Sequence, residues 1–215
     1  MLNAIMYLNS VKYMAIKDRR QREKEDLRQE ILDAARELFV AEGYESVSMR
    51  KIAEKIDYSP TTIYLYFKDK NELLHEVCEE AFSKLSDEIV RSQMQGQTPI
   101  EVLRFGMYAY VAFGLLNPHH YEVVFVTPKN SGNDTGYSFD ASMGKKAFEL
   151  LSASVANCMS AGDIRGGDVE TVSQTLWAGI HGVTSLLIAH EGFPFVERET
   201  LVSSVIDTMI AGLRT

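Results

Sequence analysis

Small hydroxyl and phenol side chains gather between positions 48 and 66 of the sequence, at spacings that suit contacts with a nucleic acid. Ser48 precedes one short helical pattern, and Ser59, followed by Pro60, precedes a second. Amide groups at a helix start and the helix dipole attract phosphate, and hydroxyls there can bind phosphates or base edges. The second pattern also offers Thr61, Thr62, Tyr64, Leu65 and Tyr66. Together these residue types indicate a surface that could bind DNA.

Two short helices, crossed by a preceding helix, must position these side chains. Ile52 and Ile56 fall on one face of the first short helix. Ile63 and Phe67 can be buried by the second, and Asp57-Tyr58 forms the turn between them. This arrangement is a helix-turn-helix, whose second helix enters the major groove of DNA. A plain helical hairpin with polar residues facing solvent has the same spacing, so the spacing alone leaves both alternatives open.

Helical spacing of apolar residues continues through almost the whole chain, and no segment has the pattern of a strand. Residues 100–115 are apolar on nearly every face, which predicts a central, buried helix. Pro128–Ser138, with two glycines, is expected to form an exposed loop. The expected helices run from about Leu27 to before Gly43, from Ser48, from Ser59 to about Phe67, from Asp69 to near Gly96, from Thr98, from Asn117, from about Phe139 to Ser160, from Val169 to Ala189 and from Val196 to Leu213. The predicted fold class is therefore all-α, with about nine helices.

Composition excludes several classes of protein. Of the 215 residues, 46% are hydrophobic and 24% are charged, which excludes wholesale disorder and collagen. Cys78 and Cys158 are far apart, offer neither a disulfide framework nor a zinc site, and fit a reducing compartment. The least charged stretch, Phe105–Leu116, has 12 residues, which is too few to span a bilayer. We therefore expect a cytoplasmic protein with no membrane partner.

The formal net charge of −8 is unevenly distributed along the chain. Residues 1–75 hold 13 basic and 13 acidic residues, whereas residues 76–215 hold 9 basic and 17 acidic residues. Between Lys12 and Arg28, seven basic residues stand against four acidic ones. A polyanionic partner would therefore approach the N-terminal end. The plain alternative is a solvated, charged helix start, and the charge run taken alone favours that alternative.

The stretch Phe39–Leu74 resembles the DNA-binding domain of TetR-family transcriptional regulators. The family pattern is F-x-x-x-G-Y/F, then T/S-x-x-x-I-A, a turn, and S-x-x-T-x-Y-x-Y-F-x-x-K-x-x-L. The matching residues, without a gap, are Phe39, Gly43, Tyr44, Ser48, Ile52, Ala53, Ser59, Thr62, Tyr64, Tyr66, Phe67, Lys70 and Leu73. The sequence departs from the family at Asp57-Tyr58, usually Gly-Val, and at Pro60, often Lys, Arg or a small residue. Because Asp tolerates a left-handed backbone better than most residues, the turn is expected to survive.

The resemblance implies a role for each of these positions. Ser48 and Arg50 should contact phosphates. The candidates for base edges are Ser59, Thr61, Thr62 and Leu65, the last through a thymine methyl group. The candidates for gripping the DNA backbone are Tyr64, Tyr66 and Lys70. A basic arm could add further contacts through Lys17, Arg19, Arg20 and Arg22.

A second, shorter resemblance lies near the C-terminus. Leu176–Gly182 is similar to the W-x-x-x-H-G signature of one TetR subgroup, with Trp177 and His181 in the matching places. Small residues recur there at steps of four, three and four, and would let another helix approach closely. They are Ala178, Gly182, Ser185 and Ala189. The stripe alone could serve core packing or dimerisation, and the resemblance implies a dimer interface on the last two helices.

The resemblance also implies a regulatory domain that encloses a small effector. The candidate pocket residues are Phe105, Tyr108, Phe113, Tyr121, Phe125, Trp177 and His181. From the residues alone, these side chains are equally an ordinary core. A pocket of this kind predicts an apolar or aromatic effector. No phosphate-binding loop, nucleophile elbow or zinc motif occurs, so we expect no catalytic residue, no metal and no cofactor.

These expectations combine into a homodimeric repressor that binds a palindromic operator and is released by a small effector. Residues 1–19 would form an N-terminal extension or arm, residues 20–70 the helix-turn-helix domain, and residues 71–215 the effector-binding and dimerisation domain. Residues 1–13 match nothing in the family, which points to an upstream start codon or an added arm. Two alternatives stay open: a small-molecule-binding protein without DNA-binding function, and an all-α enzyme that uses the aromatic pocket.

Overall fold

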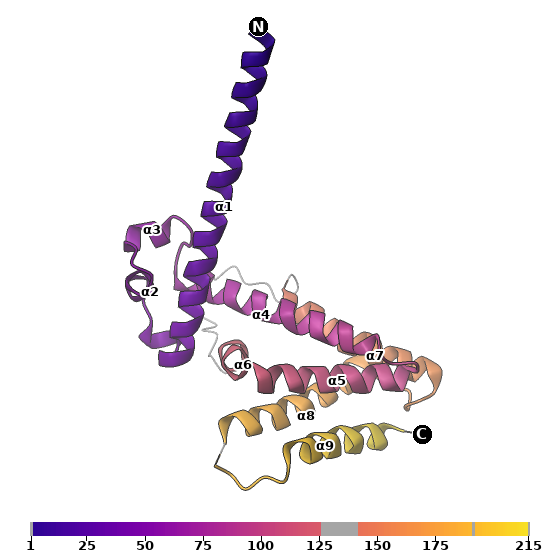
Figure 1. Ribbon diagram of the computed structural model, residues 1–215. Coiled ribbons are helices and arrows are strands. Elements are labelled where there is room, and N and C mark those ends of the chain that lie inside the picture. The colour runs from indigo at the N-terminus through magenta and orange to yellow at the C-terminus, as the bar shows by residue number, and fades with distance from the viewer. Residues whose placement is uncertain (1, 126–141, 191, 215) are drawn as a thin grey trace. The chain divides into compact units, whose positions relative to one another are not determined.

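The computed structural model describes residues 2–125, 142–190 and 192–214 (Figure 1). Within these residues the regular structure is entirely helical, which confirms the all-α prediction. The helices are α1 Leu2–Glu42, α2 Met49–Lys55, α3 Pro60–Tyr64, α4 Lys70–Gln93, α5 Pro99–Leu116, α6 Pro118–Phe125, α7 Met143–Ala161, α8 Val169–Ala189 and α9 Arg198–Leu213, and a 3-10 turn, η1, spans Tyr44–Ser46. The predicted loop at Pro128–Ser138 lies outside the described residues.

Side-chain caps fix where the long helices of the C-terminal part begin. At α5, Thr98 Oγ1 accepts from the Glu101 amide at 3.4 Å, and the Glu101 carboxylate accepts from the Thr98 amide at 3.1 Å. At α8, an Asp168 carboxylate oxygen accepts from the hydroxyl and the amide of Thr171, and these hydrogen bonds lower the pKa of Asp168. Such reciprocal or charged caps satisfy amides that a helix start leaves unpaired. The predicted bounds of α8 are confirmed to the residue.

Two helices of the N-terminal part have one boundary that differs from the prediction, α1 at its start and α3 at its end. α1 begins at Leu2 rather than near Leu27, because nothing in the first 42 residues is a glycine or proline that would stop it. α3 ends at Tyr64 rather than near Phe67, because the backbone tightens there into hydrogen bonds between residues three apart. The recognition segment is therefore one and a half turns long.

The chain divides into two compact units, residues 1–77 and residues 78–215, and the division falls within α4. In the first unit α1 packs on η1 and α2, and α2 packs on α3. The buried residues of these contacts include Ile31, Phe39, Ile52, Ile63 and Phe67. They lie on the helix faces that the sequence predicts to be apolar.

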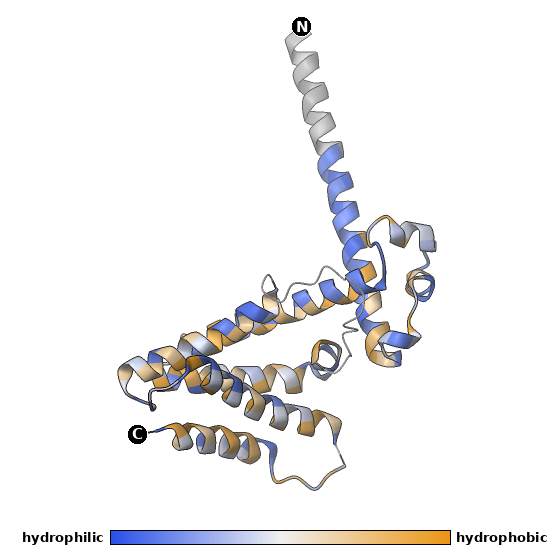
Figure 2. Ribbon diagram, turned by 180° about the vertical axis from the view of Figure 1, so that it is seen from behind, coloured by the Kyte–Doolittle hydropathy of each residue, from blue (hydrophilic) through white to orange (hydrophobic). Residues whose placement is uncertain are grey.

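In the second unit α5 is the central helix, as predicted, and contacts α6, α7, α8 and α9. It spans 18 residues and is the one helix of the described part that is long and apolar enough to cross a membrane. The sequence count of 12 uncharged residues underestimated this stretch. Packing against four helices accounts for the apolarity of α5. Hydrophilic residues, in contrast, cover residues 17–26 of α1 (Figure 2).

Candidate functional site

The hydroxyls at the starts of α2 and α3 serve as helix caps as well as surface groups. Ser48 Oγ accepts from the Lys51 amide, and Ser59 Oγ accepts from the Thr62 amide, both at 3.2 Å. The hydroxyls of Ser59 and Thr62 also lie 2.9 Å apart. Each hydroxyl is therefore held in one place on the protein surface by its own helix.

α3 divides its faces between the core and the solvent. Ile63 is fully buried, whereas Tyr64 is 55% exposed and Leu65 is 76% exposed. Thr61 is exposed beside them. The turn that precedes α3 holds Asp57 at a φ of 58°, so the predicted left-handed conformation is confirmed. The outer face of α3 is therefore an exposed patch with few charges. Its large apolar side chain, Leu65, is a suitable partner for a base edge or a methyl group.

Most cations around this patch already have carboxylate partners within the first unit. Arg50 Nε lies 2.8 Å from Glu54, and Lys51 and Lys55 pair with carboxylates of α1. Lys68 is different: it is exposed, and it has no side-chain partner among the described residues. The family pattern does not mark position 68, so sequence reasoning missed this lysine. The signal that could have indicated Lys68 is its place in the sequence, just after the recognition segment.

Lys70 makes close contacts inside the first unit. Its Nζ donates to the Tyr44 carbonyl at 2.7 Å and lies 4.0 Å from the centre of the Tyr44 ring. The Tyr44 hydroxyl in turn contacts Asn71, and burial raises the pKa of Tyr44. Lys70 thus links η1 to the start of α4, in addition to any contact with DNA.

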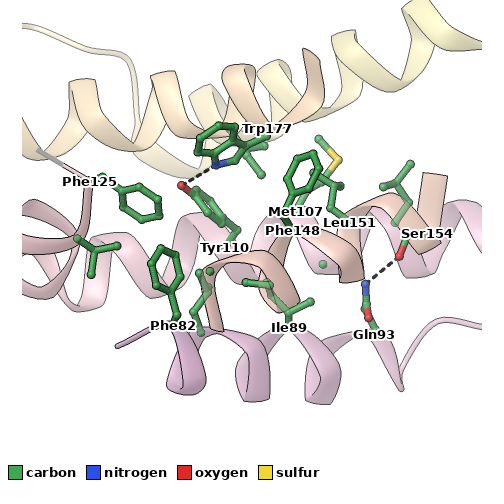
Figure 3. Close-up of a pocket in the computed structure, with 17 residues that line it drawn as sticks. Phe82, Ile89, Gln93, Met107, Tyr110, Phe125, Phe148, Leu151, Ser154 and Trp177 are labelled. Carbon is green, nitrogen blue, oxygen red and sulfur yellow. Dashed lines mark hydrogen bonds between the residues drawn. The ribbon is translucent and has the colours of Figure 1, made fainter. Parts of the chain in front are cut away.

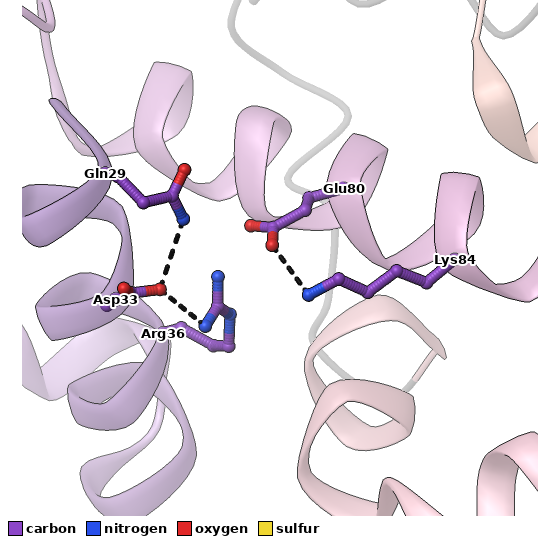
Figure 4. Close-up of polar contacts among 5 residues, drawn as sticks. All are labelled: Gln29, Asp33, Arg36, Glu80 and Lys84. Atoms are coloured by element: carbon purple, nitrogen blue, oxygen red, sulfur yellow. Dashed lines mark hydrogen bonds and ion pairs between the residues drawn. The ribbon is translucent and has the colours of Figure 1, made fainter. Parts of the chain in front are cut away.

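Charged side chains along α1 and α4 form local pairs on the helix surfaces. Asp33 Oδ1 accepts from Arg36 Nη1 at 2.7 Å and from Gln29 Nε2 at 3.2 Å (Figure 4). In α4, Lys84 Nζ donates to Glu80 at 2.7 Å (Figure 4). In the predicted basic arm, Arg19 pairs with Glu23, whereas Lys17, Arg20 and Arg22 are exposed.

The second unit contains a cavity of about 360 Å³ (Figure 3). Its walls come from α4, α5, α6, α7 and α8, and its apolar lining includes Phe82, Leu85, Ile89, Met107, Phe148 and Leu151. No charged side chain lines it among the described residues. A cavity of this size with apolar walls and a few polar groups is typical of a small-molecule site.

One end of the cavity carries a hydrogen-bonded aromatic cluster. Trp177 Nε1 donates to the Tyr110 hydroxyl at 3.2 Å (Figure 3). That hydroxyl lies 3.2 Å from His181 Nδ1. The Tyr121 hydroxyl lies 2.5 Å from the same nitrogen, and His181 Nε2 lies 3.4 Å from Ser185 Oγ. Burial lowers the pKa of His181 and raises that of Tyr110. Both shifts favour the neutral forms of these side chains, so the contacts within the cluster are hydrogen bonds and not ion pairs.

Of the seven predicted pocket residues, two line the cavity, two belong to the aromatic cluster beside it, and three do neither. Phe125 and Trp177 line the cavity, and Tyr121 and His181 lie behind its wall in the aromatic cluster. Phe105, Tyr108 and Phe113 do not line it. Sequence reasoning missed Tyr110 and Gln93, which do line it. Since α5 is apolar all round, its sequence carries no signal that selects Tyr110 over Tyr108.

The small-residue stripe of α8 is only partly covered by its own unit. Ala178 and Ala189 are exposed, Gly182 and Ser185 are half-buried, and a Cβ atom placed on Gly182 would meet nothing within 4 Å. A Cβ on Gly179 would instead meet the Met209 sulfur of α9. Gly179 therefore serves packing between α8 and α9, whereas the Gly182 side of α8 is open.

The remaining candidates for chemistry carry no reactive arrangement. Cys78 and Cys158 are buried and are not joined in a disulfide, and burial raises the pKa of the Cys158 thiol to about 11. Among the described residues, no group of three His, Cys, Asp or Glu side chains could hold a metal ion.

Both units of the chain match sequence models of known protein families. A sequence model described as bacterial regulatory proteins, tetR family, matches residues 31–77. A second, described as tetracyclin repressor-like, C-terminal domain, matches residues 103–209.

Most of the curated relatives match less than half of this chain. The HTH-type transcriptional repressor KstR of Mycobacterium tuberculosis is 38% identical over 85 residues, which cover 40% of this chain and 37% of KstR. The fatty acid metabolism regulator protein of Bacillus subtilis is 23% identical over 186 residues, 86% of this chain and 94% of that protein. The chain spans only 32–40% of the length of the first four curated relatives that it matches.

Solved structures share the fold over most of the chain. A protein of unknown function from Rhodococcus sp. RHA1 has a TM-score of 0.75 at 23% identity, over 88% of this chain and 96% of that one. FadR from Bacillus subtilis, in complex with stearoyl-CoA, has a TM-score of 0.74 at 21% identity, over 86% of this chain and 99% of that one. At these identities the likeness concerns the fold.

Proposed function

Since this chain belongs to the TetR family of bacterial regulatory proteins, we propose that it is a ligand-responsive transcriptional repressor. It binds a palindromic operator as a dimer in the cytoplasm and releases the DNA when a small apolar molecule occupies its cavity. The observation that carries this proposal is the combination, in one chain, of a helix-turn-helix surface in residues 1–77 and an apolar cavity in residues 78–215.

The DNA-binding role rests on the exposed face of α2 and α3. The capping hydroxyls and Arg50 contact phosphates, and Thr61, Thr62 and Leu65 reach base edges in the major groove. Tyr64, Tyr66, Lys68 and Lys70 contact the DNA backbone. The paired lysines and arginine exchange their carboxylate partners for phosphate, which costs little because exposed ion pairs contribute only about 0–1 kcal/mol.

The dimer forms through the outer faces of α8 and α9. The open space above Gly182 and the exposed Ala178, Ala189 and Leu186 support this placement, because small residues let a partner helix approach closely. Two copies would place their recognition segments about 34–36 Å apart, one helical turn of DNA.

The effector carries no charge in the part that enters the cavity. An ionised group would be buried there without a partner, and the free-energy cost of such burial is several kcal/mol (about 2–7 for even a neutral polar group). The stearoyl-CoA bound by FadR of Bacillus subtilis has a long apolar chain. An acyl chain would likewise suit the apolar lining of this cavity. A charged head group would have to stay outside.

The direct test is binding to the promoter region beside the coding sequence of the protein. We expect binding that weakens linearly in a plot of log affinity against log salt concentration, and release of the DNA when effector is added. Linkage requires that DNA weaken effector binding by the same factor. Effector binding without any DNA binding would instead support a small-molecule-binding protein, and turnover of the bound molecule would support an enzyme.

A further inference from the structure

The end of the cavity opposite the aromatic cluster carries a single amide side chain. Gln93 is the last residue of α4, and its Nε2 donates to Ser154 Oγ of α7 at 3.0 Å (Figure 3). Both residues line the cavity, and Ile89 and Met107 separate them from Tyr110 and Trp177 (Figure 3). The cavity thus has an apolar middle and a polar group at each end.

The orientation of the Gln93 amide follows from the hydrogen bonds around it. Ser154 has one hydroxyl hydrogen, which it donates to the Leu150 carbonyl at 2.9 Å, one turn earlier in α7. Ser154 Oγ can therefore only accept from Gln93, so the amide nitrogen faces Ser154 and the carbonyl oxygen Oε1 points away from it.

A glycine on α5 holds the amide from a second side. A Cβ atom at Gly106 would lie 2.8 Å from Gln93 Nε2, closer than such atoms approach in proteins. The amide occupies the space that this glycine leaves. Gln93 is therefore held between α5 and α7 in one conformation, and an anchor held in this way loses little entropy when a ligand binds.

Gln93 keeps more unused hydrogen-bonding capacity than the other polar side chains that line the cavity among the described residues. The Trp177 N–H is used by Tyr110, and the Tyr110 hydroxyl lies within reach of His181 and Tyr121. Gln93 retains its second N–H and Oε1, for which the described residues supply no partner. A polar group on a ligand would find its partner here.

We propose that Gln93 anchors the effector through an uncharged oxygen-bearing group, a hydroxyl or a carbonyl, while an apolar body extends toward Trp177. This inference rests on the proposed function, because it names the class of ligand that the same cavity takes. Charged ligands are disfavoured by the neutral lining, and purely hydrocarbon ligands leave Gln93 Oε1 without a partner.

Three ten-carbon probes test the inference: 1-decanol, 2-decanone and 1-decene. Trp177 is the only tryptophan and lines the cavity, so its fluorescence reports binding of each probe to the full-length protein. In the Gln93→Met variant we expect the dissociation constants of decanol and decanone to rise about five- to tenfold, the range of one hydrogen bond. The constant for decene should change less than about twofold, since decene makes no such bond. Gln95→Met, at an exposed position just beyond α4, is the matched control and should leave all three constants unchanged.

A second variant protects the test against misfolding of the first. Gly106→Ala keeps Gln93 but displaces its amide, because the added methyl would meet the flexible end of that side chain. It should weaken decanol and decanone more than decene. Equal weakening of all three probes in both variants would mean that Gln93 only tethers α4 to α7, and it would overturn the inference, as would the absence of any saturable change in Trp177 emission.

Operator release separates this inference from the proposed function. If the probes bind with the expected discrimination but never release operator DNA, the ligand class stands and the repressor proposal fails. If decanol releases the operator equally well from wild type and Gln93→Met, the repressor proposal stands and the anchor is wrong.

Discussion

The surface of α2 and α3 and the cavity of the second unit differ in how their polar side chains are bonded. Around α3 most cations lie at the protein surface and are paired with carboxylates, as Arg50 is with Glu54. In the cavity the polar groups are neutral and bonded to one another, as Trp177 is to Tyr110. Solvent screens the first set of contacts, whereas the second set lies in a low-dielectric interior.

This difference means that polar contacts contribute different free energies of binding at the DNA surface and in the cavity. Exposed ion pairs are weak and exchangeable, so the first surface can bind many phosphates with an affinity that depends on salt. Buried hydrogen bonds carry a penalty of about 1–3 kcal/mol when a partner is lost, so we expect ligand binding in the cavity to discriminate between ligands and to be insensitive to salt. The predictions below test this contrast, beginning with the largest effect.

The Gly182→Leu variant asks whether the DNA surface suffices without the dimer. Its side chain has open space within its own subunit, so the monomer should fold, but the helices of a partner would be pushed apart. We expect a monomer by light scattering. We also expect operator affinity to fall by at least about 100-fold, because only one half-site is engaged.

The control for this variant is Gly179→Ala, whose added methyl meets Met209 within the same subunit. It should lower the melting temperature without changing the oligomeric state. A normal dimer from Gly182→Leu would move the interface away from α8.

Lys68→Ala should weaken operator binding by up to about tenfold and reduce the slope of log affinity against log salt by about one. The melting temperature should not change, because the Lys68 side chain has no partner among the described residues. Lys70→Ala should weaken binding similarly and also lower the melting temperature, since it loses the contact with the Tyr44 carbonyl. Lys146→Ala, at an exposed lysine of α7, is the control. An unchanged salt slope in Lys68→Ala would remove that residue from the DNA surface.

Trp177→Phe should weaken effector binding about threefold and leave both operator affinity and its salt slope unchanged. The variant keeps an aromatic ring in the cavity wall but loses the donor to Tyr110. Calorimetric titration with 1-decanol measures the change. If only stability falls, Trp177 belongs to the core and not to the binding surface.

The smallest expected effect concerns pH. Burial lowers the pKa of His181 below its ordinary 6.5, so the unfolded chain binds the proton more readily than the folded one. The free energy of unfolding should therefore fall as the pH drops below about 6.5. His181→Gln should show a shallower fall between about pH 7.5 and 5.5 in urea titrations. A parallel fall in both proteins would show that His181 does not contribute.

The local features of the fold could be predicted because each depends on residues close together in sequence. The caps at Ser59 and Asp168, the turn at Asp57 and the buried Ile63 all follow from neighbours within four positions. The DNA-contacting roles of the exposed residues stay predictions, since they depend on a partner that only binding experiments can supply.

The cavity could be predicted only in part, because it depends on how separate helices pack. Phe82 and Phe148 line it from α4 and α7, more than sixty positions apart, and nothing in either segment indicates that they meet. Trp177 stood out as the single tryptophan. Gln93 did not, because its environment is made by Gly106 and Ser154, which are distant in sequence.

The central place of α5 has a consequence for synthesis of the chain. α5 ends at Leu116, but α9, the last helix that covers it, ends only at Leu213. Ribosomes add about 5–20 residues per second, so the apolar faces of α5 stay uncovered for roughly 5–20 s while the rest of the chain is made. During that interval the nascent chain exposes the apolar faces of α5, and the yield of the protein in a cell should depend on chaperones that bind this segment until α7, α8 and α9 have emerged.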